Sequence, residues 1–147
     1  MLTKVISSAM VAAGMMAASP AFAGPVTISG SVTVSKGITL SCSISGAGSS
    51  STAGSGTLTS LSLSGGTFGL CGSISFTGLP YAVSASGGTL TITGVVVTAI
   101  TGNCAGNLSG SYNSTTGVVT FNNATLPTTS GGSDCKINGS ATLTPPI

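Results

Sequence analysis

Alternation of apolar and hydroxyl side chains over residues 37–44 constrains the fold more than any other feature of this sequence. Successive side chains of an extended strand point to opposite faces, so the two kinds of residue separate onto two faces. The apolar row is Ile38, Leu40, Cys42 and Ile44, and the hydroxyl row is Thr39, Ser41 and Ser43. We therefore predict a half-buried strand that carries a cysteine in its buried row.

The rest of the chain repeats this alternation in short pieces. Glycine and proline turn signals recur every eight to twelve residues, and no helical period is present after residue 23. The clearest hairpin joins residues 81–85 to residues 89–93 across Gly87 and Gly88. We predict an all-β chain with one domain over residues 24–147, either an antiparallel β-sandwich of immunoglobulin type or a related barrel. A β-solenoid is the alternative, although no fixed repeat period supports it.

Residues 46–56 are a run of glycine, serine, alanine and threonine. Low-complexity sequence of this kind is typical of flexible surface loops, and we predict one here. A phosphate-binding loop would need a following Gly-Lys-Ser/Thr helix start, which is missing.

The first residues have the layout of a secretory signal peptide. Lys4 supplies the positive region, an apolar stretch follows, and residues 20–23 end in an A-x-A-like cleavage site. We predict cleavage after Ala23, so that residues 1–23 are the signal. The expected product passes through the periplasm and is secreted or held on the outer cell surface, and no later stretch is apolar for long enough to span a bilayer.

Four cysteines remain in the exported chain, namely Cys42, Cys71, Cys104 and Cys135. An even number of cysteines in an oxidising compartment indicates two disulfides, and three connectivities are open. Locality favours Cys42 with Cys71 and Cys104 with Cys135. A zinc site is disfavoured because the spacings are near thirty residues and the chain has no histidine.

Charged residues are almost absent after the signal. Lys36, Asp134 and Lys136 leave a formal net charge of +1, and we expect both lysines to be solvated. Nucleic-acid binding is disfavoured because it needs basic and stacking residues that are missing. With so little charge the chain has little electrostatic protection against self-association.

The residue types available in the chain also argue against an enzyme. Hydrolysis by paired carboxylates needs two acids, and serine hydrolysis needs a base beside the nucleophile. Ser133 and Lys136 match an S-x-x-K motif only formally, because its partner motifs are missing. We therefore expect no catalytic residue, no metal ligand and no cofactor. Four glycosylation-type sequons are ascribed to composition, at Asn107, Asn113, Asn123 and Asn138.

Several landmarks resemble the PraB-like alkane oxidation protein activator proteins. They are the signal peptide, residues 37–42, Leu70-Cys71, residues 77–80, residues 102–104, and Cys135 shortly before residues 143–145. After the Gly-Leu-Pro sequence this chain has Tyr81, where the family often carries tryptophan. The resemblance implies an exported bacterial protein associated with growth on hydrocarbons and with biofilm or surface adhesion.

Two functions are consistent with these features. The first is a non-enzymatic matrix or adhesive protein that associates with itself as an oligomer or filament, with the strand over residues 26–34 adding to a neighbour's sheet edge. The second is a soluble binding module or surface-active protein that contacts an apolar ligand or an oil–water interface. The expected partners are thus other copies of the chain or a hydrophobic surface.

Overall fold

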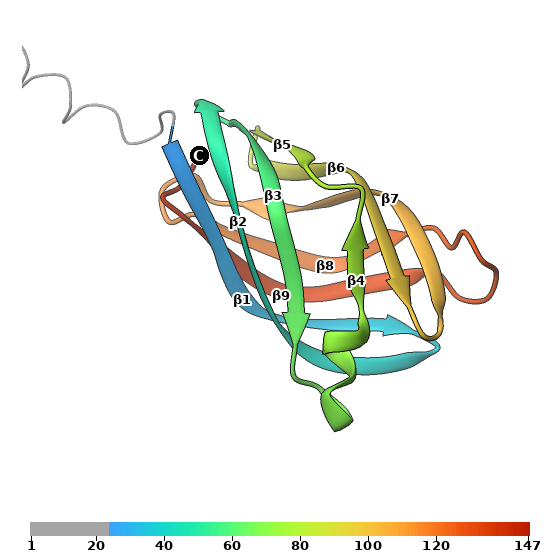
Figure 1. Ribbon diagram of the computed structural model, residues 1–147. Coiled ribbons are helices and arrows are strands. Elements are labelled where there is room, and N and C mark those ends of the chain that lie inside the picture. The colour runs from blue at the N-terminus through green and yellow to red at the C-terminus, as the bar shows by residue number, and fades with distance from the viewer. Residues whose placement is uncertain (1–23) are drawn as a thin grey trace, which may run out of the picture.

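The computed structural model describes residues 24–147. The predicted signal peptide, residues 1–23, lies outside the described residues. Within the described range the elements are β1 Gly24–Lys36, β2 Ile38–Thr52, β3 Ser55–Ser64, the short 3-10 helix η1 Thr67–Ser73, β4 Ser75–Thr77, β5 Tyr81–Ser86, β6 Thr89–Ala99, β7 Gly102–Tyr112, β8 Val118–Leu126 and β9 Cys135–Thr144 (Figure 1).

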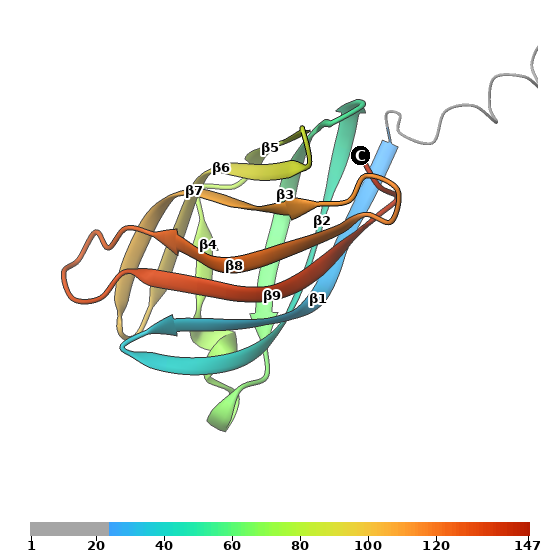
Figure 2. The same ribbon diagram turned by 180° about the vertical axis from the view of Figure 1, so that it is seen from behind.

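The strands form one antiparallel sheet that closes into a barrel (Figure 1 and Figure 2). Pairing runs from β6 through β5, β3, β2, β1, β9, β8 and β7 and returns to β6, which makes a ring of eight strands. The short strand β4 pairs with the second half of β6, beyond the part that pairs with β5. Every pairing in the ring is antiparallel. The predicted all-β class is confirmed, because the described elements are strands apart from the short helix η1.

The finer architecture differs from the main expectation. A sandwich of two separate sheets is not confirmed, because hydrogen bonding between β6 and β7 joins the two ends of the strand order. The solenoid alternative is not supported either, since the strands pair antiparallel around a ring. A ring of about eight strands encloses a space that side chains can fill, which makes closure compatible with a packed core.

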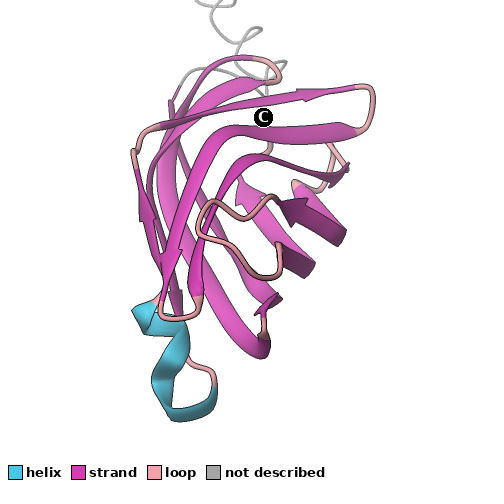
Figure 3. Ribbon diagram, turned by 90° about the vertical axis from the view of Figure 1, so that its right-hand side faces the viewer, coloured by secondary structure: helices cyan, strands magenta, loops and turns pink. Residues whose placement is uncertain are grey.

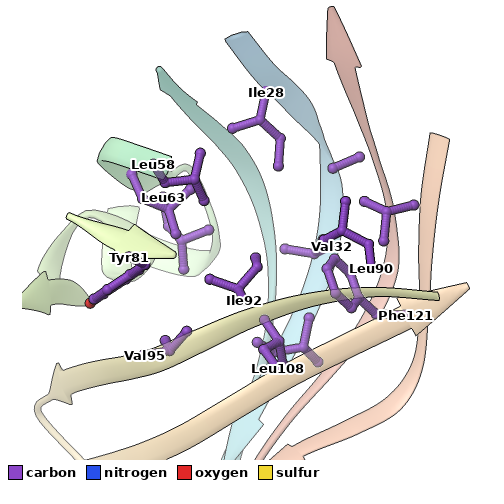
Figure 4. Packing of buried hydrophobic residues seen from close by; sticks show 14 of the residues in the cluster. Ile28, Val32, Leu58, Leu63, Tyr81, Leu90, Ile92, Val95, Leu108 and Phe121 are labelled. Carbon is purple, nitrogen blue, oxygen red and sulfur yellow. The ribbon is translucent and has the colours of Figure 1, made fainter. Parts of the chain in front are cut away.

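The inward side chains fill the barrel (Figure 4). They include Ile28, Val32, Leu58, Leu63, Tyr81, Leu90, Ile92, Val95, Leu108 and Phe121. The void left among the apolar side chains at the centre is about 20 Å³, which is room for about one water molecule. The interior is therefore a packed core, and it has no room for a hydrocarbon ligand.

The flexible loop predicted over residues 46–56 is wrong. Strands β2 and β3 run through this segment and pair on both sides of a tight turn (Figure 1). At Gly48 a Cβ atom would collide with the Thr57 carbonyl oxygen, next to a shift in the β2–β3 register. Glycine here permits close contact between two strands, and composition alone does not distinguish that role from flexibility.

The predicted free edge at residues 26–34 is also wrong. Strand β1 pairs with β2 along its whole length, and residues 27–35 pair with β9 on the other side. Its backbone groups are therefore already used within the ring, so this strand cannot add to a neighbour's sheet in the folded state.

The hairpin predicted around Gly87 and Gly88 is confirmed by the pairing of β5 with β6. Tyr81, at the start of β5, is 1% exposed. Its hydroxyl donates to the Thr77 carbonyl at 2.6 Å and accepts the Val96 N–H at 3.2 Å, which fastens the break between β4 and β5 to β6. Burial raises the pKa of Tyr81, and hydrogen bonding with Val96 offsets part of that effect.

Candidate functional site

Lys36 is buried, contrary to the expectation that it is solvated. It is 7% exposed at the end of β1. The ammonium donates to Thr128 Oγ1 at 2.9 Å, to the Gly131 carbonyl at 3.1 Å and to the Ser133 carbonyl at 2.6 Å. These oxygens belong to the segment between β8 and β9, which we term the 127–134 loop. An ammonium has three N–H donors, and each of them has an acceptor in this loop.

The remaining polar groups of the 127–134 loop support the same arrangement. Asp134 Oδ1 accepts the Thr128 N–H at 2.9 Å, and Ser130 Oγ accepts the Asn103 N–H at 2.8 Å. Lys136 lies exposed on β9. The Ser133 carbonyl and the Asp134 side chain thus hold the loop together.

Both disulfides lie at the end of the barrel that carries Lys36. Cys42 on β2 is bonded to Cys71 in η1, with the Cα atoms 5.7 Å apart. Cys104 on β7 is bonded to Cys135 at the start of β9, with the Cα atoms 6.1 Å apart. These are the pairs favoured by locality. They fasten η1 and the 127–134 loop to the barrel.

The sequon asparagines have structural contacts. Asn107 Oδ1 accepts the Gly94 N–H at 3.1 Å, beside an irregularity in the pairing of β6 with β7. Asn113 Oδ1 accepts the Thr115 N–H at 2.8 Å in the turn before β8. Asn138 Oδ1 accepts the Asn123 N–H at 2.7 Å, and Asn138 also donates to the Asn123 side chain at 3.2 Å. These amides satisfy backbone groups at turns and bulges, which local side-chain hydrogen bonding favours.

Exposed apolar side chains gather at one end of the barrel. Ile38 follows the β1–β2 turn and is 42% exposed, and Ile100 in the β6–β7 turn is 67% exposed. A shallow groove of about 40 Å³ lies between them and the base of η1. Its lining is Val34, Ser35, Lys36, Ile38, Leu40, Leu70, Ser73, Ile74, Ala99, Ile100 and Thr101. The Lys36 stem lines this groove, while its ammonium is bound by the 127–134 loop.

A hook formed by residues 65–73 projects beyond the strands at the same end of the barrel (Figure 3). Phe68 in this hook is 95% exposed. Its backbone is left-handed, with φ 56° and ψ 25°, a conformation that is unfavourable for a bulky side chain. We use the term apolar end for Ile38, Phe68 and Ile100 together with the groove.

The walls of the barrel have a different chemistry. Outward positions of β1, β2 and β9 carry hydroxyl or amide side chains that lie side by side across the strands, such as Ser29 between Ser45 and Thr142. Ser31 lies in the same way between Ser43 and Ser140. The molecule is thus amphiphilic, with polar, nearly uncharged walls and one apolar end.

Sequence reasoning missed the apolar end. It placed Ile38 in the buried row of its strand, but the residue lies at a hairpin end where the barrel no longer covers it. Phe68 lies in η1, outside the strands. A usable signal was present in the apolar residues placed within turn sequences, Phe68 among glycines and Ile100 between two strands.

Among residues 24–147, no group of three or more histidine, cysteine, aspartate or glutamate side chains is placed to hold a metal ion. In the same part of the chain, no helix is both long and apolar enough to cross a membrane.

Comparison with known proteins identifies one family. The family model described as alkane oxidation protein activator PraA/PraB-like matches residues 1–147. Neither the curated proteins nor the solved structures gave a significant match.

Proposed function

Since the chain belongs to the PraA/PraB-like alkane oxidation protein activator family, we propose that it is an exported, non-enzymatic protein that supports growth on hydrocarbons by adsorbing to an apolar phase. The apolar end is the observation that carries this proposal. Ile38 and Ile100 are exposed there at the lining of an apolar groove, and Phe68 is exposed in the hook at the same end of the barrel. The packed interior directs the contact to the surface, because the central void of about 20 Å³ cannot hold an alkane.

The energy available at the apolar end is sufficient for reversible adsorption. The exposed fractions of Ile38 (42%) and Ile100 (67%) together equal about one isoleucine side chain, and Phe68 at 95% adds nearly one phenylalanine. Transfer of one such side chain out of water is worth about 1.5–3 kcal/mol. The apolar end thus contributes about 3–6 kcal/mol, whereas the hydroxyl-covered walls favour water.

Charge and export are consistent with this function. Described residues carry three charged side chains, and one of them, Lys36, is enclosed by the 127–134 loop. Lys36 is the charged residue in the groove lining, and because its ammonium is already enclosed, contact of the groove with oil does not have to desolvate it. The disulfides fit an oxidising compartment outside the cytoplasm. The predicted adhesive function would use the same end on an apolar solid surface, since β1 has no free edge for strand addition.

The test measures binding of the exported protein to hexadecane droplets. We expect Ile38→Thr combined with Ile100→Thr to weaken binding roughly 10- to 100-fold, because about one buried isoleucine equivalent is lost. Val96→Thr is the matched control, since Val96 is exposed on the wall and lies outside the groove. Wild-type protein that binds droplets no better than the double variant would refute the proposal. Terminal sequencing of the exported protein should begin at Gly24.

A further inference from the structure

We propose that the hook of residues 65–73 is an insertion device, in which Phe68 enters a layer of alkyl chains as the leading anchor of the protein. This inference rests on the proposed function and assigns its partner and its principal contact residue. The partner is a fluid apolar phase made of alkyl chains, such as a hydrocarbon droplet.

The first observation is the combination of exposure and strain at Phe68. The side chain is 95% exposed, so burial in the protein does not compensate for its left-handed backbone. A strained conformation at an exposed position is typical of sites where the protein holds a residue for interaction with a partner. The sequence supplies glycine on the C-terminal side, and Gly69 also has a positive φ, of 68°.

The second observation is that the hook is fixed at its base. The Cys71 N–H donates to the Gly65 carbonyl at 3.0 Å, and the Gly69 N–H donates to the Gly66 carbonyl at 3.1 Å. Cys71 is also bonded to Cys42 on β2. Phe68 is therefore held away from the barrel, and these restraints reduce the backbone entropy that the hook has to lose when it enters a partner.

The third observation concerns the size and charge of the contact. A single phenylalanine buries about 150–250 Å², and the neighbouring isoleucines are only part exposed. This area is far below the roughly 800 Å² that each partner contributes to a stable protein interface. No charged residue occurs between Lys36 and Asp134 in the sequence, so the hook carries no charge. A small, uncharged and rigid anchor suits an alkyl layer better than a second copy of the chain.

Substitution of Phe68 separates insertion from folding. Phe68→Asn keeps a residue that tolerates the left-handed conformation but removes the apolar side chain. We expect droplet binding to fall roughly 10- to 100-fold, with the thermal midpoint unchanged or higher by a few degrees. Phe68→Leu, which stays apolar, should bind within about threefold of wild type.

A fluorescent probe tests insertion directly, since the chain contains no tryptophan. In Phe68→Trp the emission should shift to the blue and be quenched by a brominated alkane when hexadecane droplets are added. In the control Ser31→Trp, on the hydroxyl wall, emission should stay unchanged. Unshifted emission from Phe68→Trp on droplets that bind the protein would overturn the inference.

The outcomes distinguish the inference from the proposed function. If wild-type protein binds droplets and Phe68→Asn binds equally well, the insertion role is wrong while adsorption through Ile38 and Ile100 stands. If wild-type protein does not bind, the proposed function itself fails. If light scattering shows a wild-type oligomer that Phe68→Asn converts to monomer, Phe68 contacts a second copy, and the inference is overturned.

Discussion

Replacement of Lys36 by methionine tests whether the enclosed ammonium organises one end of the barrel. The wild-type ammonium donates three hydrogen bonds to the 127–134 loop at 2.6–3.1 Å. Methionine keeps most of the apolar stem that lines the groove but cannot donate. The loop oxygens would then lose their shared partner, and the loop would be held by its own hydrogen bonds, by its hydrogen bonds to Asn103 and Ala105 on β7, and by the Cys104–Cys135 disulfide.

The magnitude follows from the exposure of the acceptors. A hydrogen bond to a charged group contributes about 1.5–3 kcal/mol, but a simple threefold sum is too large. Gly131 and Ser133 are exposed, so their carbonyls can bind water in the variant, and Thr128 Oγ1 keeps its hydrogen bond to the Gly131 carbonyl at 2.8 Å. Methionine is uncharged, so the variant also avoids the desolvation cost that the wild-type protein incurs by burying the ammonium. We therefore expect a loss of about 2–3 kcal/mol in the free energy of unfolding.

Urea denaturation with the disulfides intact measures this loss, and hydrogen exchange locates it. Exchange should increase at Asn103 and Thr129, whose amides bond across the base of the loop. Lys136→Met is the matched control, because Lys136 is exposed on β9, and it should change stability by less than about 0.5 kcal/mol. Equal effects of the two substitutions would refute the reasoning that the loop is built around Lys36.

Three further predictions concern the rest of the barrel. Replacing Cys42 and Cys71 together by serine should lower the free energy of unfolding by about 3.6 kcal/mol, from closure of a loop with a sequence separation of 29; in urea melts, a loss below about 1 kcal/mol would contradict this. Gly48→Ala should cost about 2 kcal/mol or more, since its Cβ would meet the Thr57 backbone, whereas Gly72→Ala, where a Cβ has open space, should cost much less by the same assay. Because burial raises the pKa of Tyr81, the folded state favours the neutral phenol; its stabilisation is complete below the ordinary tyrosine pKa of about 10 and is lost as pH rises through the higher folded value. Tyr81→Phe should therefore remove part of the alkaline loss of stability in melts above pH 10, and an unchanged alkaline profile would argue against this assignment.

Several features of the fold were predictable because they depend on neighbours in the chain. The buried positions of Leu40 and Cys42 follow from the period of two along a strand, and the hairpin at Gly87 and Gly88 follows from its turn sequence. The sequence-based predictions were wrong where the local composition is compatible with two different structures. The glycines of residues 46–56 indicated flexibility, yet in the structure they permit two strands to approach closely.

The candidate site was predicted less completely than the fold. The four cysteines were identified, but they define where the hook and the 127–134 loop are fastened, and the apolar end itself was missed. Exposure of Ile38, Phe68 and Ile100 depends on where the barrel ends, and a strand pattern does not contain that information. The burial and hydrogen bonding of Tyr81 could not be predicted for the same reason, because the partners of its hydroxyl belong to other strands.

The sequence by itself determined that the chain is all-β, nearly uncharged and supplied with cysteines for two disulfides, because alternation and composition are local properties. Only the tertiary structure decided that the strands close into a ring, that β1 has no free edge, and that one end is apolar. Lys36 shows the physical reason. Its hydrogen-bond partners lie 92–97 residues away along the chain, so its burial depends on the order and register in which distant strands pair.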